Sequence, residues 1–467
     1  MENRKKKAAL HNLGCKVNAY ETEAMRQLLE AAGYEIVSFE ETSDVYLVNT
    51  CSVTNMADRK SRQMLHRARK RNPEAVIVAA GCYVQASAEE ILESGAADLV
   101  IGNNQKGKLL ELLSGYEKEQ GAFQSVIDIA HTGEYEEMSL EKTAEHTRAF
   151  IKIQDGCNQF CSYCIIPFTR GRIRSRKLED ILSEVGRLSF AGYKEVVLTG
   201  IHLSSYGKDL EGTVSLLEVI RQVEKIEGIE RIRLGSLEPR IVTEEFVKGL
   251  ASMEKVCPHF HLSLQSGCDE TLRRMNRHYT TEEYAVCCDR LRNYYIHPAI
   301  TTDVIVGFPQ ETEEEFTETL DFLRRIGFYE MHVFKYSRRR GTKAAAMDGQ
   351  VKEEVKTERS RRALLLEKEL SEEFRQFYEG RAAELLLEEG LEIGGRPYIS
   401  GYTKEYVKAA IRLTEDTKEI LLPGRIVPVK LLKGKGNGWE GMLEAELSDG
   451  ISGHKVKKLE ENPSTAR

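Results

Sequence analysis

Short apolar stretches alternate with amphipathic stretches of helical period along most of this chain, and they form two separate series. Strands that alternate with helices favour parallel sheets with helices on their faces. The first series therefore predicts a parallel α/β domain, and the second predicts a full or partial βα barrel of six units. The expected strands are 8–12, 45–49, 76–80 and 99–101 in the first series, and 148–153, 195–198, 231–234, 259–264, 302–306 and 331–336 in the second.

The remaining segments have a different character. Residues 116–146 are polar, acidic and weakly periodic, which predicts a linker. Residues 352–388 form a charged helical connector, and the short segments after it, interrupted by Gly and Pro, favour a small all-β barrel. We therefore expect an α/β protein with an N-terminal domain at 5–117, a linker at 118–142, a barrel core at 143–373, a small β-barrel at 376–446 and a disordered tail at 447–467.

Composition excludes several classes of protein. Of the 467 residues, 41% are apolar, which is enough for packed cores. No apolar run approaches the roughly 20 residues that cross a bilayer, and the basic start lacks the apolar stretch of a signal peptide. We expect a cytoplasmic protein without a membrane partner. The net charge of −7 disfavours a protein that coats nucleic acid through bulk positive charge.

Three of the ten cysteines stand close together directly after the first strand of the second series. Cys157, Cys161 and Cys164 have the spacing C-x3-C-x2-C. Three thiolates on one loop can hold three irons of a four-iron cluster and leave the fourth iron open to a small molecule. A structural zinc site normally has four protein ligands, and no nearby Cys or His supplies a fourth. The spacing predicts an iron–sulfur cluster.

This spacing, with aromatic Tyr163 before the last cysteine, resembles the radical S-adenosylmethionine (SAM) superfamily. The resemblance implies that the open iron binds SAM. One electron then cleaves SAM to methionine and a 5′-deoxyadenosyl radical, which abstracts a hydrogen atom. Reactive groups of βα barrels lie at the C-terminal ends of strands, where Gly200, Glu238, Gln265 and Asp303 are candidate SAM contacts alongside Tyr163. Ordinary turn chemistry at strand ends is the alternative for each of them.

Three further cysteines, Cys15, Cys51 and Cys82, each follow a predicted strand of the first series. Because the C-terminal ends of parallel strands share one edge, these cysteines are expected to converge despite their wide spacing. Inert packing is the alternative for any one buried cysteine. Three ligands again leave one iron open, which predicts a second cluster that can bind an exogenous group.

The two cysteine sets in this order resemble the methylthiotransferase family, over nearly the whole chain. The resemblance implies an N-terminal cluster domain, a radical SAM barrel and a C-terminal RNA-binding TRAM barrel with an OB-like fold. It assigns Cys15, Cys51 and Cys82 to an auxiliary [4Fe–4S] cluster and the tight set to the SAM-cleaving [4Fe–4S] cluster. The motifs that carry it include Leu13-Gly14-Cys15-Lys16-Val17-Asn18, Asn49-Thr50-Cys51-Ser52-Val53, Gly81-Cys82, Pro167-Phe168-Thr169-Arg170-Gly171-Arg172, Leu264-Gln265-Ser266-Gly267 and Gly307-Phe308-Pro309-Gln310-Glu311-Thr312.

The family implies a transferase that inserts sulfur and a methyl group at a C–H bond, and it has three substrate branches. Two act on the tRNA adenosine just 3′ of the anticodon (position 37), which bears an N6-threonylcarbamoyl or an isopentenyl group, and the third acts on a ribosomal-protein aspartate. The stretches Gly14–Asn18 and Thr199–His202 resemble the threonylcarbamoyladenosine branch; the isopentenyl branch usually has Gln-Met where this chain has Lys16-Val17. A non-catalytic RNA-binding protein with structural metal is the alternative from another class. An electron donor and a sulfur source are implied partners.

Basic clusters support an RNA partner, the tRNA anticodon loop. Residues 59–71 hold seven cations and no acid. Arg172, Arg174 and Arg176 lie beside the cluster loop, where phosphate contacts would orient a substrate, and Lys404 with Tyr406 in the small barrel suits a flexible RNA loop. Structural ion pairs and core packing are the alternatives. The remaining cysteines, Cys257, Cys268, Cys287 and Cys288, lack ligand spacing and are expected to be structural.

Overall fold

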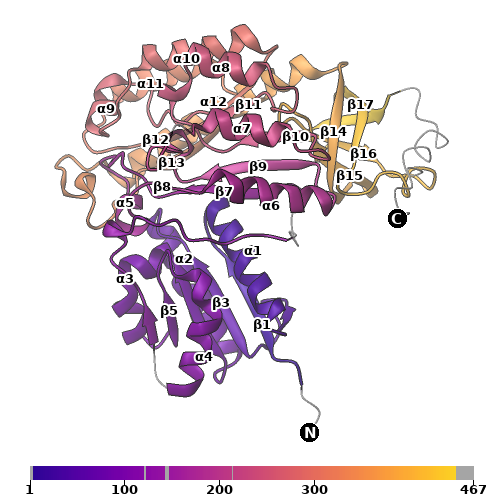
Figure 1. The fold of residues 1–467 in the computed structure, drawn as a ribbon. Helices are drawn as coiled ribbons and strands as arrows, with labels where there is room; N and C mark the ends of the chain where they lie inside the picture. The colour runs from indigo at the N-terminus through magenta and orange to yellow at the C-terminus, as the bar shows by residue number, and fades with distance from the viewer. Residues whose placement is uncertain (1–3, 120–122, 142–146, 213, 449–467) are drawn as a thin grey trace.

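The computed structural model describes residues 4–119, 123–141, 147–212 and 214–448. They form three parts: a central barrel, an N-terminal domain and a small C-terminal barrel (Figure 1). The N-terminal domain lies below the barrel in this view, and the small C-terminal barrel lies at its right-hand end. The expected disordered tail lies outside the described residues, apart from its first two positions. Within the described part of the chain, no helix is long and apolar enough to span a membrane.

The N-terminal domain is a six-stranded parallel sheet in the order β2-β1-β3-β4-β5-β6. Its central strand β3 is buried at every position, as expected for a parallel strand with helices on both faces. The expected parallel α/β domain is confirmed. The strands are β1 (Lys7–Asn12), β2 (Glu35–Val37), β3 (Val45–Thr50), β4 (Val76–Gly81), β5 (Leu99–Ile101) and β6 (Phe123–Ser125); the helices are α1 (Lys16–Ala31), α2 (Asn55–Arg71), α3 (Cys82–Glu93), η1 (Lys106–Lys108) and α4 (Leu109–Glu119).

The segment expected to be a linker is partly structured, which corrects the sequence interpretation. Strand β6 lies within this segment and pairs with β5. After the short helix η2 (Ile129–His131), Met138 and Leu140 are buried in the main core, and the amide of Leu140 donates to Glu184 Oε1 at 2.9 Å. The apolar residues of this segment are too few to show periodicity, but Met138 and Leu140 pack in a core that contains residues of both domains.

The central domain is a partial barrel of six parallel strands, as predicted, with one additional short strand, β8, that pairs antiparallel with β7. Its strands form the sheets β10-β9-β7-β8 and β11-β12-β13, which parallel bridges join at Ile232–Val256 and Leu237–Leu262. Among the described strands, β13 does not pair with β7, so the barrel is open there, and α1 packs beside β7. The strands are β7 (Ala149–Asp155), β8 (Arg174–Ser175), β9 (Glu195–Gly200), β10 (Arg231–Leu234), β11 (His259–His261), β12 (Ala299–Val306) and β13 (Glu330–Lys335).

Helices cover the outer face of this barrel (Figure 1). The helix α11 begins with a capping box, in which Thr312 and Glu315 each bond the other's backbone amide, and α10 begins in the same way with Thr280 and Glu283. The helices are α5 (Ile166–Thr169), α6 (Leu178–Phe190), η3 (Leu203–Ser205), α7 (Leu216–Glu224), η4 (Pro239–Ile241), α8 (Glu244–Ala251), α9 (Asp269–Arg274), α10 (Thr281–Tyr294), α11 (Glu313–Ile326) and η5 (Lys343–Ala346).

A long helix, α12 (Glu353–Tyr378), connects the central domain to a closed five-stranded barrel in the order β14-β15-β16-β18-β17. The expected small β-barrel is present, although the connector helix ends ten residues earlier than the sequence suggested, because 382–388 already belong to β14. Its strands are β14 (Ala382–Ile393), β15 (Arg396–Tyr402), β16 (Lys408–Arg412), β17 (Ile426–Leu432) and β18 (Leu443–Leu447). It docks on the central barrel through Arg231 and Arg233, which donate to the carbonyls of Tyr402 and Lys404 at 2.9 and 3.0 Å.

Candidate functional site

The three widely spaced cysteines follow β1, β3 and β4 at one edge of the N-terminal sheet. Cys51 and Cys82 are buried, and Cys15 is exposed. A Cβ atom added at Gly14 would lie 2.9 Å from Cys51 Sγ, and Gly14 has a φ of +108°, so only glycine brings the two loops this close. Burial and the neighbouring Cys82 and Cys15 raise the pKa of Cys51 to about 12. The structure therefore brings these thiols into one group.

Two asparagines hold the loops of this group. Asn18 Nδ2 donates to the carbonyls of Leu13 and Thr50 at 2.7 and 3.0 Å, which ties the segments before Cys15 and Cys51 together. Asn103 Nδ2 lies 3.5 Å from Cys82 Sγ and donates to the carbonyl of Thr169 in the barrel at 2.8 Å. Sequence reasoning missed Asn103, since nothing in its local pattern marks it.

The tight cysteine set lies on the loop after β7. A Cβ atom at Gly156 would collide with the carbonyl of Arg172, and the amide of Cys157 donates to the carbonyl of Gly171 at 3.0 Å, so the loop is pinned against the following turn. Burial and the neighbouring Cys161 raise the pKa of the Cys157 thiol to about 11, and burial with both other cysteines raises that of Cys164 further. Each thiol thus lies in the electric field of the others.

Both cysteine sets fit an iron–sulfur cluster better than a single ion. In the described part of the chain, neither set brings three ligand atoms within 4.8 Å of one another. The sulfur atoms of each set are therefore too far apart to bind one zinc ion at Zn–S distances of about 2.3 Å. The ligands of an iron–sulfur cluster can lie farther apart, because each binds a separate iron. Burial and mutual repulsion oppose the thiolates, and bound iron would relieve this. Three thiols each also match two clusters with one open iron.

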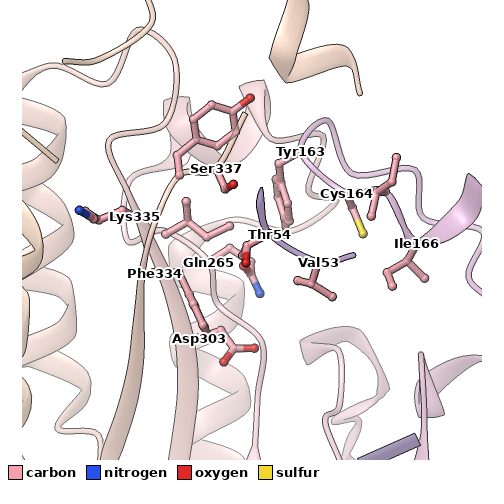
Figure 2. A pocket seen from close by; sticks show the side chains of 13 residues that line it. Val53, Thr54, Tyr163, Cys164, Ile166, Gln265, Asp303, Phe334, Lys335 and Ser337 are labelled. Atoms are coloured by element: carbon pink, nitrogen blue, oxygen red, sulfur yellow. The ribbon is translucent and has the colours of Figure 1, made fainter. Parts of the chain in front are cut away.

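A cavity of about 240 Å³ borders Cys164 of the tight set and the residues that follow Cys51 (Figure 2). Val53 and Thr54, which follow Cys51, line it from the N-terminal domain, and Cys164 lines it from the tight set. Three of the predicted SAM contacts, Tyr163, Gln265 and Asp303, line it together with apolar Ile165, Ile166, Ile305 and Phe334. The structure therefore places one space in contact with the loops of both sets.

The two other predicted SAM contacts lie outside the lining of this cavity. Gly200 ends β9 against Gln154, whose side chain a Cβ at Gly200 would meet at 2.9 Å. Glu238 is buried, pairs with Arg240 at 3.0 Å, lies 3.8 Å from His202 Nε2, and its charge acts on Cys157. Both residues therefore border the cysteine loop at the strand ends, and their contact with SAM stays a prediction.

Arg277 is a site residue whose role the sequence did not reveal. Its Nη1 donates to Cys161 Sγ at 3.3 Å, and its Nε donates to Tyr279 Oη at 3.0 Å. Although burial opposes its charge, the neighbouring Tyr279, Tyr163 and Cys161 hold the pKa of Arg277 above its usual range. In the sequence it appears as one more cation after Arg273 and Arg274, and only the fold turns it towards the cluster loop.

Two of the predicted RNA contacts beside this loop are structural, which corrects the sequence interpretation. Arg174 is fully buried and donates to the carbonyls of Arg170 and Arg172 at 2.8 and 3.0 Å, and Arg176 is buried in an ion pair with Glu184. Arg174 in strand β8 and Arg176 directly after that strand are both buried, so phosphate cannot reach them. Arg172 remains exposed, with its guanidinium 4.7 Å from the centre of the Phe160 ring.

The predicted pair in the small barrel lies at its junction with the central barrel. The Tyr406 ring stacks on His259 and Tyr402 at 4.5 and 4.6 Å, which leaves no face for a base and corrects that prediction. Lys404 is partly exposed, with Nζ 3.7 Å from Glu384. Its contact with RNA stays a prediction.

A buried charge network joins α1 of the N-terminal domain to the barrel. Glu21 pairs with Lys152 and Arg170 at 2.7 and 2.8 Å and also with Lys106, and Arg170 reaches Asp155 at 3.1 Å. Burial opposes the charge of Asp155, but Arg170 and Lys152 hold its pKa below the usual range. Arg170 Nη2 also donates to Asn18 Oδ1 at 2.5 Å, so the network reaches the residue that ties the auxiliary loops.

The remaining cysteines, Cys257, Cys268, Cys287 and Cys288, are all buried, and in the described ranges none belongs to a group of three possible ligands. Cys287 Sγ donates to the carbonyl of Pro239 at 3.2 Å.

Comparison with known proteins adds independent evidence. Residues 151–323 match the radical SAM superfamily, and residues 7–102 match the family described as uncharacterized protein family UPF0004. The threonylcarbamoyladenosine tRNA methylthiotransferase MtaB of Bacillus subtilis is 42% identical over 96% of this chain and 98% of its own. The chain belongs to the radical SAM methylthiotransferase family. Members of this family use SAM and two [4Fe–4S] clusters, and two sets of three thiols are present here.

Further relatives come from two branches of the methylthiotransferase family. The MtaB protein of Aquifex aeolicus is 44% identical over 80% of this chain and 90% of its own. A tRNA-2-methylthio-N(6)-dimethylallyladenosine synthase of Carboxydothermus hydrogenoformans is 36% identical over 92% of this chain and 97% of its own. Among solved structures, the radical SAM methyltransferase TsrM of Kitasatospora setae is 15% identical with a TM-score of 0.54 over 71% of this chain and 73% of its own, a likeness of fold alone.

Proposed function

We propose that this enzyme converts N6-threonylcarbamoyladenosine at position 37 of tRNA to its 2-methylthio derivative. The observation that carries the proposal is the pair of three-thiol sets whose loops border one cavity, in a chain 42% identical over nearly its full length to a threonylcarbamoyladenosine methylthiotransferase. The dimethylallyladenosine enzymes resemble the chain less, at 36–38% identity.

In this proposal Cys157, Cys161 and Cys164 hold the SAM-binding cluster, and Cys15, Cys51 and Cys82 hold the auxiliary cluster. When bound, the clusters supply the electron for SAM cleavage and a site for the sulfur that is transferred. Neither set has a fourth thiol, which leaves room for an exogenous ligand.

The protein side chains orient the reactants and exclude water. Gln265 and Asp303 present polar atoms to the cavity beside Cys164, where they suit the amino and hydroxyl groups of SAM. Ile165, Ile166, Ile305 and Phe334 give the rest of the cavity an apolar lining, which protects a reactive species from solvent. Arg277 donates to Cys161 Sγ and stabilises negative charge on that sulfur.

The partners follow from this reaction. We propose that the anticodon loop of tRNA enters at the opening between β13 and the N-terminal domain, where Phe334 is exposed. A cellular reductant and a sulfur source complete the reaction, and the cytoplasm is where tRNA substrate is available.

Nucleoside mass spectrometry of tRNA tests the proposal. A strain that lacks this gene and any second copy is expected to accumulate N6-threonylcarbamoyladenosine without its 2-methylthio form, and the wild-type gene restores that form. Restoration of 2-methylthio-isopentenyladenosine instead would assign the other tRNA branch, and unchanged tRNA would direct attention to a protein substrate. Anaerobic reconstitution separates the non-catalytic alternative, because a metal-stabilised RNA-binding protein would hold zinc and would not cleave SAM.

A further inference from the structure

Three possible metal ligands meet on neighbouring strands of the central barrel. His261 ends β11, Asp303 lies in β12 and His332 lies in β13, and these strands are adjacent in the order β11-β12-β13. One ligand atom from each side chain lies within 4.8 Å of the other two. Among the residues that the structure describes, this is the one such group of three. It contains none of the six cysteines assigned to the clusters.

The register of these strands brings the three side chains to one face. Asp303 pairs directly with His332, and His261 pairs with Thr301. Because side chains alternate along a strand, Thr301 and Asp303 point to the same side of β12. The same rule places His332 on the side of Phe334, which lines the cavity together with Asp303 (Figure 2). The three side chains therefore face the side on which the cavity lies.

The separations within the group suit a single ion. His261 Nε2 lies 3.3 Å from Asp303 Oδ2. Two ligand atoms that are each about 2.0–2.1 Å from a tetrahedral ion lie about 3.4 Å apart. The ring of His332 lies 5.8 Å from that of His261, centre to centre, and one of its nitrogens completes the group. The carboxylate and the two imidazoles can therefore share one ion with little movement.

The other ring nitrogen of His261 is held by a hydroxyl group. Nδ1 of His261 and Nε2 of His259 lie 3.0 and 3.3 Å from Thr301 Oγ1. Burial holds the pKa of His259 below its usual range, so its neutral ring can accept from the hydroxyl, which in turn accepts from His261 Nδ1. Metal-binding histidines typically donate their second ring N–H in this way. Within the described ranges, Nε2 of His261 is buried and makes no hydrogen bond, although Asp303 lies close.

We propose that His261, Asp303 and His332 bind one divalent transition-metal ion of the zinc type, separate from both clusters. Two imidazole nitrogens and one carboxylate oxygen suit zinc, whereas magnesium and calcium prefer oxygen ligands. Three protein ligands leave one position open, as in zinc sites that bind a reactant. This inference goes beyond the proposed function and does not depend on which substrate the enzyme modifies.

The open position is next to the space where the reaction occurs. Asp303 lines the cavity, and His332 is exposed, so water or an oxygen atom of a bound substrate can reach the ion. Asp303 would bind the ion through Oδ2, the oxygen near His261, and would keep its other oxygen for the proposed contact with SAM.

Zinc retention by the cluster-loaded enzyme tests the site. Anaerobically reconstituted protein is mixed with Zn²⁺, or with Co²⁺ in a parallel sample, and passed through a gel-filtration column. Mass spectrometry then counts iron and the added metal separately. The wild type is expected to retain about one zinc ion per chain. In competition with a chelator, His332→Gln is expected to weaken zinc binding at least about tenfold with unchanged iron, since even the loss of a group behind a ligand costs 10- to 100-fold.

Controls separate this site from other binding. His66→Gln removes an exposed histidine of α2 outside the group, and it is expected to retain zinc like the wild type. X-ray absorption at the zinc edge is expected to show nitrogen and oxygen neighbours at about 2.0–2.1 Å, whereas zinc that had replaced iron at the cysteines would show sulfur at about 2.3 Å. If His332→Gln loses iron, Asp303→Asn and the wild-type spectrum decide the question.

Equal zinc retention in the wild type and His332→Gln, sulfur neighbours at the zinc, or a wild-type enzyme that retains neither Zn²⁺ nor Co²⁺ would overturn the metal site. The proposed function would stand in each case, because nucleoside analysis of cellular tRNA measures it independently.

Discussion

At the residue scale, the two thiol sets differ in how the chain supports them. The tight set lies on one loop, and Arg277 donates to Cys161 at 3.3 Å. The spaced set depends on three separate strand ends, on the close approach of Gly14 to Cys51, and on Asn103 beside Cys82. The two sets can therefore be disrupted independently.

Substitution of single cysteines is expected to separate the two steps of the reaction. Cys157→Ala is expected to abolish reductive SAM cleavage, because the SAM-binding cluster loses a ligand. Cys15→Ala is expected to retain SAM cleavage and to lose methylthiolation. Chromatography of 5′-deoxyadenosine and mass spectrometry of the RNA product measure the two activities. A Cys15→Ala protein that still methylthiolates RNA would refute this division of labour, and Cys268→Ala serves as the matched control.

The acid stability of the protein is expected to depend in part on His202. Burial lowers the pKa of His202 to about 4, outweighing the nearby Glu238, while Arg277, Lys208 and Arg240 act in the same direction as burial. In the unfolded chain His202 takes up a proton near pH 6.5, whereas in the folded protein His202 stays neutral until the pH falls to about 4. The stabilising contribution is thus complete above pH 6.5, and it is lost as the pH falls towards 4, by about 3 kcal/mol at most.

Urea unfolding at several pH values between 7 and 4.5 measures this effect. His202→Gln is expected to flatten the pH dependence of the free energy of unfolding, whereas His66→Gln, an exposed residue of α2, leaves the slope unchanged. Identical slopes in the wild type and His202→Gln would show that His202 titrates normally in the folded protein.

At the element scale, α1 is the element that joins the two cluster domains. Its first turn carries Lys16 and Asn18, and its second carries Glu21, which reaches Lys152 of β7 and Arg170. The helix therefore fixes the auxiliary edge relative to the barrel through buried charges.

Neutralising Glu21 is expected to destabilise the protein strongly. Glu21→Gln leaves buried Lys106, Lys152 and Arg170 short of a counter-ion, a loss of roughly 3–5 kcal/mol in the free energy of unfolding. Glu30→Gln breaks an i,i+4 pair with Arg26 on the same helix and is expected to cost under about 1 kcal/mol. Urea titration followed by circular dichroism compares the two variants, and similar losses would contradict the role assigned to the network.

At the scale of the whole molecule, the net charge of −7 conceals an uneven distribution. The basic helix α2 begins at Asn55, next to the cavity residues Val53 and Thr54. Three of its later cations are paired, Arg67 and Arg71 with Glu40 and Arg69 with Asp98. Arg59 and Lys60, within the first two turns of α2, are exposed and available for phosphate.

Binding of tRNA is expected to weaken with salt and to depend on the start of α2. The double variant Arg59→Gln and Lys60→Gln is expected to weaken binding and to reduce the slope of log K against log salt by about 1.5, as for two lost phosphate contacts. Fluorescence anisotropy with labelled tRNA between 50 and 200 mM salt, about the range over which such contacts respond, measures both. Lys225→Gln with Lys248→Gln on the outer helices is the control, and equal effects would argue against α2 as the contact.

The sequence by itself determined the three-part architecture and the two cysteine sets. Alternation of strands and helices is a local periodicity, and the positions of Cys157, Cys161 and Cys164 on one loop are a local spacing. Both can therefore be recognised from the sequence alone. The convergence of Cys15, Cys51 and Cys82 was also predictable, because parallel strands share an edge.

Only the tertiary structure decided what the charged residues do. Arg174 and Arg176 look like phosphate ligands in the sequence, yet the fold buries both, whereas the Arg277 side chain donates to Cys161. Strand β6 and the burial of Leu140 were likewise invisible, because their partners are more than 20 residues away. A cationic side chain can contact RNA, form an ion pair or donate to a thiol. Which of these it does depends on the distant residues that surround it, and no local pattern in the sequence shows them.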